Sequence, residues 1–149
     1  TEELVKYLCL FLYPYRSRFF NEPMDGIVYA VMIGMGFATL ENLMYALQYG
    51  LETVILRAFT AVPAHAAFAI IMGYYFGKAK FEPDPKIRRK RLLMALFAPL
   101  VIHGLYDFLI LQEIYEGLIA LAIAVLIASI IFARQLLLEQ QENSPFKES

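Results

Sequence analysis

The sequence has few of the residues that a soluble domain uses for its surface or for cross-linking. A single cysteine, Cys9, excludes a disulfide framework, and only 18% of the residues are charged. No basic segment precedes the first apolar run, so we expect no cleavable signal peptide. Internal repeats and low-complexity segments are also absent. With 60% apolar residues, the chain is too apolar for an ordinary soluble domain of this length, which needs a polar shell.

Apolar residues make up 60% of the chain and gather in runs long enough to cross a bilayer, which takes about 20 residues of helix. The runs predict membrane spans at 24–48, 53–77, 92–112 and 115–134, the last within a helix over 115–138. A shorter apolar helix is predicted over 2–13. We therefore expect an all-α, polytopic transmembrane helical bundle that forms a single membrane-embedded domain over residues 1–149.

The basic residues gather on one side of this predicted bundle. Of the 13 lysines and arginines, all but Lys6 and Arg57 fall in the predicted loop 78–91, in the 14–23 connection or near the C-terminus. By the positive-inside rule, these regions are cytoplasmic. The loop 78–91 and the C-terminus are thus predicted inside the cell, and the short outer loops carry only acidic charge.

Several ionisable residues lie within the predicted helices at a similar depth. Ionisable groups inside a membrane span are costly and suggest a functional site. At a rise of about 1.5 Å per residue, they lie roughly 17 to 24 Å above the predicted cytoplasmic ends of their helices. Six residues share this slab: Glu2, Glu3, Glu41, His65, His103 and Asp107.

Small residues and prolines indicate that these polar groups face the interior of the bundle. Small side chains recur every four positions beside His65 and ahead of Glu41, and such spacing lets helices approach closely in lipid. Pro63 precedes His65 and Pro99 precedes His103, and each proline frees a backbone carbonyl. A freed carbonyl is tolerated where a bent helix lines a cavity.

The residue types suit the activation of water. His103 and Asp107 are one helical turn apart, so the carboxylate can fix the imidazole tautomer. Glu41, His65 and His103 could together hold zinc with one open position. Without a metal, a glutamate could act as general base while a histidine polarises a carbonyl. Either arrangement could hydrolyse a peptide bond within the membrane.

Simpler interpretations stay open at this point. Glu2 and Glu3 can be a solvated chain start, with Lys6 as their i,i+4 and i,i+3 partner, and a membrane histidine can simply bond a neighbouring helix. The polar cluster could also bind and sequester a partner transmembrane helix without catalysis. A proton or ion carrier is disfavoured, because the polar residues cluster at one depth instead of forming a path to both faces.

Four segments resemble motifs of the PrsW-type intramembrane proteases, which are related to the CAAX prenyl endopeptidases. They occur in the family's order and together cover residues 2 to 107: EELVK (Glu2, Glu3, Lys6), GFATLEN (Phe37, Glu41, Asn42), HAAFAIIMG from His65, and HGLYD (His103, Asp107). The family normally has membrane spans ahead of the first motif. None precedes it here, so we expect that N-terminal spans are missing from this chain.

The resemblance implies a membrane endopeptidase that cleaves a single-pass protein such as an anti-sigma factor. It implies Glu2, Glu3, Glu41, His65 and His103 as catalytic or metal-binding residues, with Lys6, Asn42 and Asp107 in support. Zinc is implied for a metal-dependent mechanism and no cofactor for a glutamic one, and the resemblance leaves both open. The expected setting is a bacterial or archaeal cell membrane, with the lipid bilayer and a membrane substrate, and no nucleic acid, as partners.

Overall fold

The computed structural model describes residues 2–112, 114–115 and 117–146, and the described residues form helices without any strand. In this part of the chain, six α-helices and one short 3-10 helix follow one another: α1 (Glu2–Leu12), η1 (Pro14–Arg16), α2 (Pro23–Tyr49), α3 (Leu51–Phe59), α4 (Ala61–Lys80), α5 (Pro85–Leu111) and α6 (Leu118–Glu142). By length and composition α2, α5 and α6 could each cross a membrane, and α3 and α4 could together form a fourth, bent span. The predicted helical membrane bundle is confirmed.

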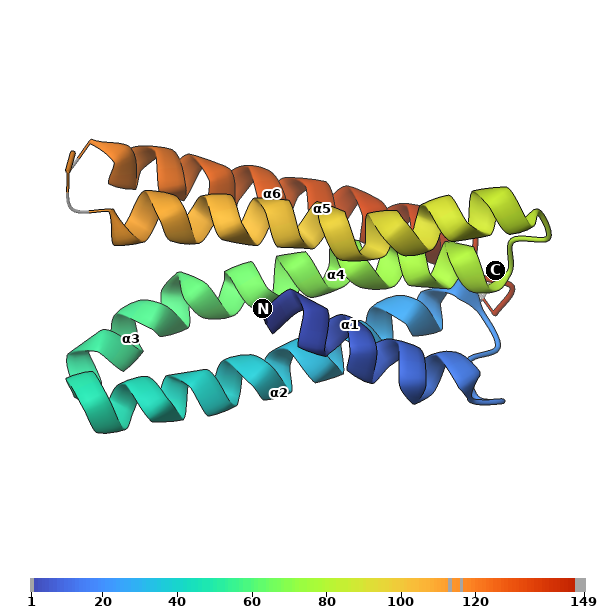
Figure 1. The fold of residues 1–149 in the computed structure, drawn as a ribbon, viewed down its shortest axis with the longest axis horizontal. Coiled ribbons are helices and arrows are strands. Elements are labelled where there is room, and N and C mark those ends of the chain that lie inside the picture. The colour runs from blue at the N-terminus through green and yellow to red at the C-terminus, as the bar shows by residue number, and fades with distance from the viewer. Residues whose placement is uncertain (1, 113, 116, 147–149) are drawn as a thin grey trace.

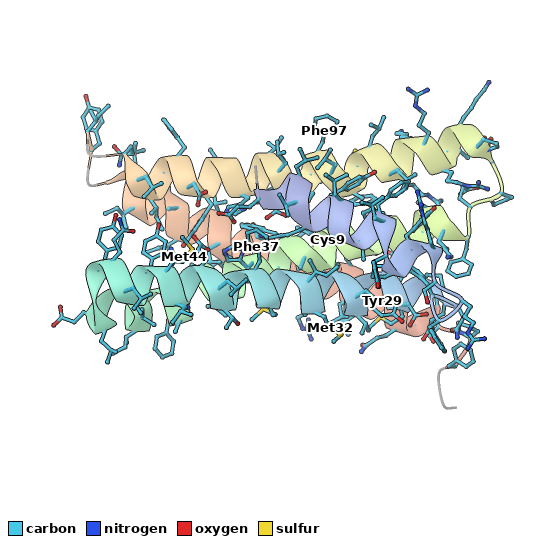
Figure 2. All side chains as sticks on the ribbon, turned by 60° about the horizontal axis from the view of Figure 1, so that its bottom comes forward. Cys9, Tyr29, Met32, Phe37, Met44 and Phe97 are labelled. Atoms are coloured by element: carbon cyan, nitrogen blue, oxygen red, sulfur yellow. The ribbon has the colours of Figure 1, made fainter. Side chains whose placement is uncertain are left out.

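Helix α4 lies at the centre of the bundle and packs against α2, α5 and α6 (Figure 1). Most of its residues are buried, including Phe68, Ile71 and Phe76. The outward faces of the other helices carry apolar side chains, among them Met32, Met44 and Phe97 (Figure 2). An apolar exterior of this kind suits contact with lipid.

Glycines allow α2 and α4 to touch backbone to backbone near one end. A Cβ atom added at Gly73 would lie 2.6 Å from Ile27 Cα, and one added at Gly26 would lie 2.8 Å from Gly77 Cα. No side chain fits in so small a space, so these positions require glycine. The small-residue faces predicted on these two segments are the faces that meet.

An aromatic cluster next to this contact positions the short helix α1. Phe76 of α4 is fully buried, with its ring centroid 4.8 Å from that of Tyr7 and 5.5 Å from that of Tyr15. Phe11 stacks between these tyrosines. The C-terminal end of α1 is held by this cluster. Its N-terminal end therefore lies near the middle of the bundle, where Figure 1 marks the N-terminus. Glu2 and Glu3 therefore lie at mid-depth.

The predicted single helix over 53–77 is wrong, because the structure breaks it at Thr60. Helices α3 and α4 meet there at a bend of 40°. Pro63 is the third residue of α4, so its ring would clash with the carbonyl of Phe59, four residues earlier, in a continuous helix. Helix α3 accordingly ends at Phe59.

The predicted loop 78–91 is also wrong in extent, since only residues 81–84 lie outside the helices. Asp84 caps α5 by accepting a 2.7 Å hydrogen bond from the Lys86 amide, and Pro85 occupies the first helical position. The basic segment from Lys86 to Arg91 contains neither proline nor glycine, so it forms part of the helix. Likewise α6 extends beyond the predicted residue 138 to Glu142.

Candidate active site

The first two turns of α1 bring two glutamates and a lysine into the bundle. Glu3 and Lys6 are each 3% exposed, and Lys6 Nζ donates to Glu3 Oε1 at 2.6 Å. Glu2 Oε2 lies 3.8 Å from the same ammonium. The ring of Phe37, from α2, has its centroid 5.2 Å from Lys6 Nζ. Glu3 and Lys6 therefore form a buried charged pair, and the partly exposed Glu2 lies at its edge.

His103 joins α5 to this network. Its Nδ1 donates to Glu3 Oε1 at 2.9 Å, because a carboxylate oxygen can only accept. Its Nε2 lies 3.3 Å from Asp107 Oδ2, one helical turn away, as the spacing predicted. Phe68 of α4 stacks on the imidazole with a centroid distance of 5.0 Å. His103 is thus held between two carboxylates and one aromatic face.

His65 of α4, like His103, has a polar partner at each ring nitrogen. Lys6 Nζ lies 2.8 Å from its Nδ1, and Glu41 Oε2 lies 2.9 Å from its Nε2. An ammonium can only donate, so Nδ1 accepts and the hydrogen on Nε2 is donated to Glu41. The two partners therefore select the same tautomer of His65. Its ring centroid is 5.2 Å from that of His103.

Glu41 is paired with an arginine as well as with His65. Arg57 Nη2 lies 2.8 Å from Glu41 Oε2, and Arg57 Nε donates to Asn42 Oδ1 at 2.9 Å. In the sequence, Arg57 stands out only as an exception to the charge bias, and no role was predicted for it. Its position could have indicated a role, since an arginine inside a membrane span requires a polar partner.

The group that could bind a metal differs in one member from the predicted set of Glu41, His65 and His103. One potential ligand atom from each of Glu2, His65 and His103 lies within 4.8 Å of the others, whereas Glu41 bonds His65 and Arg57. A carboxylate and two imidazoles are a donor set that zinc takes in catalytic sites. Glu2 Oε2 and Glu3 Oε2 are buried without a hydrogen-bond partner among the described residues. Such oxygens favour a cation, so the residues fit a metal ion.

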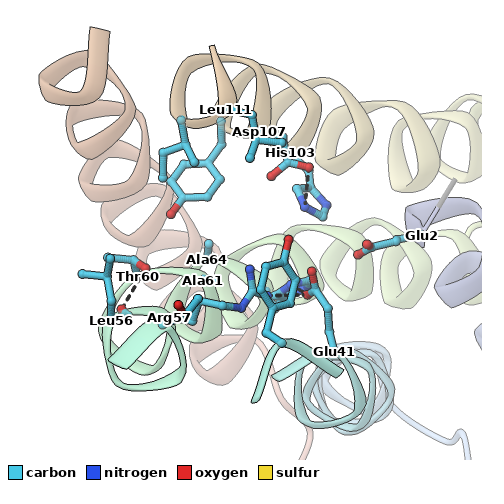
Figure 3. A pocket seen from close by; sticks show the side chains of 15 residues that line it. Glu2, Glu41, Leu56, Arg57, Thr60, Ala61, Ala64, His103, Asp107 and Leu111 are labelled. Atoms are coloured by element: carbon cyan, nitrogen blue, oxygen red, sulfur yellow. Dashed lines mark hydrogen bonds and ion pairs between the residues drawn. The ribbon is translucent and has the colours of Figure 1, made fainter. Parts of the chain in front are cut away.

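A cavity of about 400 Å³ opens beside this group (Figure 3). Its polar lining includes Glu2, Glu41, His65, His103 and Arg57. Apolar side chains from α3, α4 and α5 also line it, namely Leu56, Ala61, Ala64, Ile110 and Leu111. A polypeptide segment with apolar side chains could therefore approach the carboxylates and imidazoles.

Comparison with known proteins gives a consistent set of relatives. The model of a family described as "PrsW family intramembrane metalloprotease" matches residues 1–134. The chain is 46% identical over 126 residues to "Protease PrsW" of Geobacillus kaustophilus, a match that covers 82% of this chain and 55% of the relative. It is 41% identical to the protein of that name from Clostridioides difficile, over 85% of this chain and 55% of the relative.

A third relative of the same name, from Bacillus subtilis, is 43% identical over 73% of this chain and 50% of its own length. The chain thus spans about half the length of the curated relatives it matches. No solved structure matches the chain.

Proposed function

Because the chain belongs to the PrsW family of intramembrane metalloproteases, we propose that it hydrolyses a peptide bond in or near the membrane span of a single-pass protein. The convergence of Glu2, Glu3, His65 and His103 from α1, α4 and α5 beside a cavity carries this proposal. The resemblance of the motifs supports an anti-sigma factor as one such substrate.

The metal-dependent version of the reaction has the stronger support, since the donor set and the buried carboxylate oxygens that lack a hydrogen bond both suit a cation. We propose Glu2, His65 and His103 as the ligands and zinc as the ion, which would replace Lys6 at His65 Nδ1 and one of the two carboxylates at His103. When bound, zinc would polarise the scissile carbonyl and lower the pKa of a coordinated water. Glu41 then supports the site through His65 and is not itself a ligand.

The remaining residues orient these groups and handle protons. Glu3 Oε1 holds His103 through Nδ1 and Lys6 through its ammonium, which leaves Glu3 Oε2 free to take a proton from water. Asp107 restrains the opposite nitrogen of His103. The apolar cavity walls would exclude bulk water from the bound segment, and a low local dielectric strengthens each of these polar contacts.

The orientation in the membrane follows from the charge bias. The α4–α5 turn and the C-terminal end of α6 lie at the same end of the bundle (Figure 1). We propose that this end faces the cytoplasm, with the site in the half of the membrane toward the outside. Cysteines introduced into residues 81–84 should then react with impermeant reagents only from the cytoplasmic side.

The proposed reaction is tested with the full-length protein in lipid nanodiscs and a tagged single-pass anti-sigma factor. We expect Glu3→Gln to lower the cleavage rate by about 10² to 10⁴-fold, the usual contribution of a general base. Glu52→Gln, at an exposed position on α3, is the matched control and should cleave normally. Full activity of Glu3→Gln would contradict the role of Glu3.

The same preparation tests the metal by mass spectrometry. Near-stoichiometric zinc in the wild type and its loss in a His65→Ala, His103→Ala double variant are expected. Unchanged zinc in that variant would contradict these ligands. A wild type that binds its partner without cleaving it would instead indicate a protein that sequesters a transmembrane helix.

A further inference from the structure

Arg57 is held by three residues of one neighbouring helix, although it lies within a bent span where an unpaired arginine is costly. Its Nη2 lies 2.8 Å from Glu41 Oε2, its Nε donates to Asn42 at 2.9 Å, and its Cζ lies 3.8 Å from the centroid of Tyr45. Only 15% of the side chain is exposed. The guanidinium is therefore fixed in position and is not a mobile surface group.

The contact with Glu41 connects Arg57 to the candidate metal centre. One oxygen, Glu41 Oε2, accepts from both Arg57 Nη2 and His65 Nε2. The location of that oxygen is thus set from α3 as well as from α2. Because His65 donates through Nε2, its Nδ1 is the ring nitrogen that faces α1, where Lys6 Nζ lies.

We propose that Arg57 is a positioning residue that acts through Glu41 on His65, an inference that rests on the proposed function. The guanidinium holds the Glu41 carboxylate at the point where it accepts the Nε2 hydrogen of His65. That bond keeps the hydrogen on Nε2, so that Nδ1 faces the Glu2 and Glu3 side and could bind a metal ion in place of its present partner, the Lys6 ammonium. Partners of this kind behind a metal-binding histidine typically contribute about 10 to 100-fold in metal affinity.

A purely structural role has a different signature. Arg57 also fastens α3 to α2 near the Gly50 turn through Asn42 and Tyr45, so its loss could loosen the fold. If Arg57 only holds α3 against α2, its replacement would lower thermal stability whether or not Glu41 is present. A positioning role makes the effects of Arg57 and Glu41 on zinc affinity overlap, because both act through the same bond to His65.

The test measures zinc affinity of the purified full-length protein by competition with a chromophoric chelator, together with its thermal unfolding. We expect Arg57→Gln and Glu41→Gln each to weaken zinc binding by about 10 to 100-fold. The double variant should bind zinc about as tightly as whichever single variant has the lower zinc affinity. Arg134→Gln, which removes an exposed arginine from α6, is the matched control and should bind zinc as the wild type does.

Arg57→Lys keeps the charge but cannot bond Glu41 and Asn42 through one planar fork, so an intermediate affinity is expected. This variant decides the question if Arg57→Gln does not fold. Wild-type zinc affinity in a folded Arg57→Gln or in Arg57→Lys overturns the proposal, and so do additive effects in the double variant. Wild-type zinc binding in His65→Ala would instead overturn the proposed metal centre.

A spectroscopic measurement reports directly on His65. The chain has only two histidines, so ¹⁵N-histidine labelling with His65→Ala and His103→Ala assigns both rings. In the zinc-free protein, we expect His65 to carry its hydrogen on Nε2 in the wild type and to show mixed tautomers in Arg57→Gln. An unchanged His65 spectrum in a folded Arg57→Gln would contradict positioning through Glu41.

Discussion

Helices α2 and α4 meet in two different ways at their two ends. At the glycine end, formed by Gly26, Gly73 and Gly77, the backbones touch and leave no room for a side chain. At the polar end, Glu41 and His65 bridge the helices, and a cavity of about 400 Å³ lies beside them. One helix pair thus provides both a rigid contact and a site.

The difference shows how a membrane bundle can contain charges. Small residues give close van der Waals contact where association is needed, since lipid supplies little hydrophobic drive between helices. Where the helices diverge, long polar side chains fill the space and satisfy one another. A buried charge is tolerated there because each one has a partner on another helix or turn.

The largest effect on stability is expected at the polar end. Lys6→Met removes the cation next to Glu3, His65 and Glu2 and leaves a buried carboxylate without its closest partner. Breaking a buried pair in this way costs about 3 to 5 kcal/mol. Thermal unfolding in detergent should show the loss, and the Glu3→Gln, Lys6→Met double variant should regain part of it. Wild-type stability of Lys6→Met would show that the ammonium is dispensable.

A smaller loss is expected at the glycine end. Gly73→Leu places a side chain where Ile27 Cα is only 2.6 Å from the new Cβ, so α2 and α4 must separate. Overpacking typically costs about 1 to 3 kcal/mol. Gly36→Ala is the matched control, since nothing lies within 4 Å of its added Cβ, and it should unfold no earlier than the wild type. Equal stability of both variants would disprove the close contact.

The smallest effect is expected for a charged pair outside both regions. Lys78 Nζ lies 2.6 Å from Glu139 Oε1 on α6, but the side chains are 32% and 44% exposed. Exposed pairs contribute about 0.2 to 1 kcal/mol, so a double-mutant cycle with Lys78→Met and Glu139→Gln should yield a coupling in that range. A coupling as large as that between Glu3 and Lys6 would remove the distinction between buried and exposed pairs.

Much of the architecture was predictable because it depends on local properties of the chain. Apolar runs predicted the helical membrane bundle, and small-residue spacing predicted the faces on which Gly34 and Gly73 lie. Helical rise placed the ionisable residues at one depth, and the i,i+4 spacing paired His103 with Asp107. Hydropathy, rise and spacing all act within one helix, so they can be read before the helices pack.

Patterns along the chain were thus enough to predict the all-helical class, the membrane setting and the residue types at the site. Packing between helices settled that Glu2 lies with the histidines while Glu41 bonds Arg57. Which carboxylate meets which imidazole depends on the rotation, separation and bend of helices far apart in the chain. Those quantities arise from packing between helices, and no spacing within one helix encodes them.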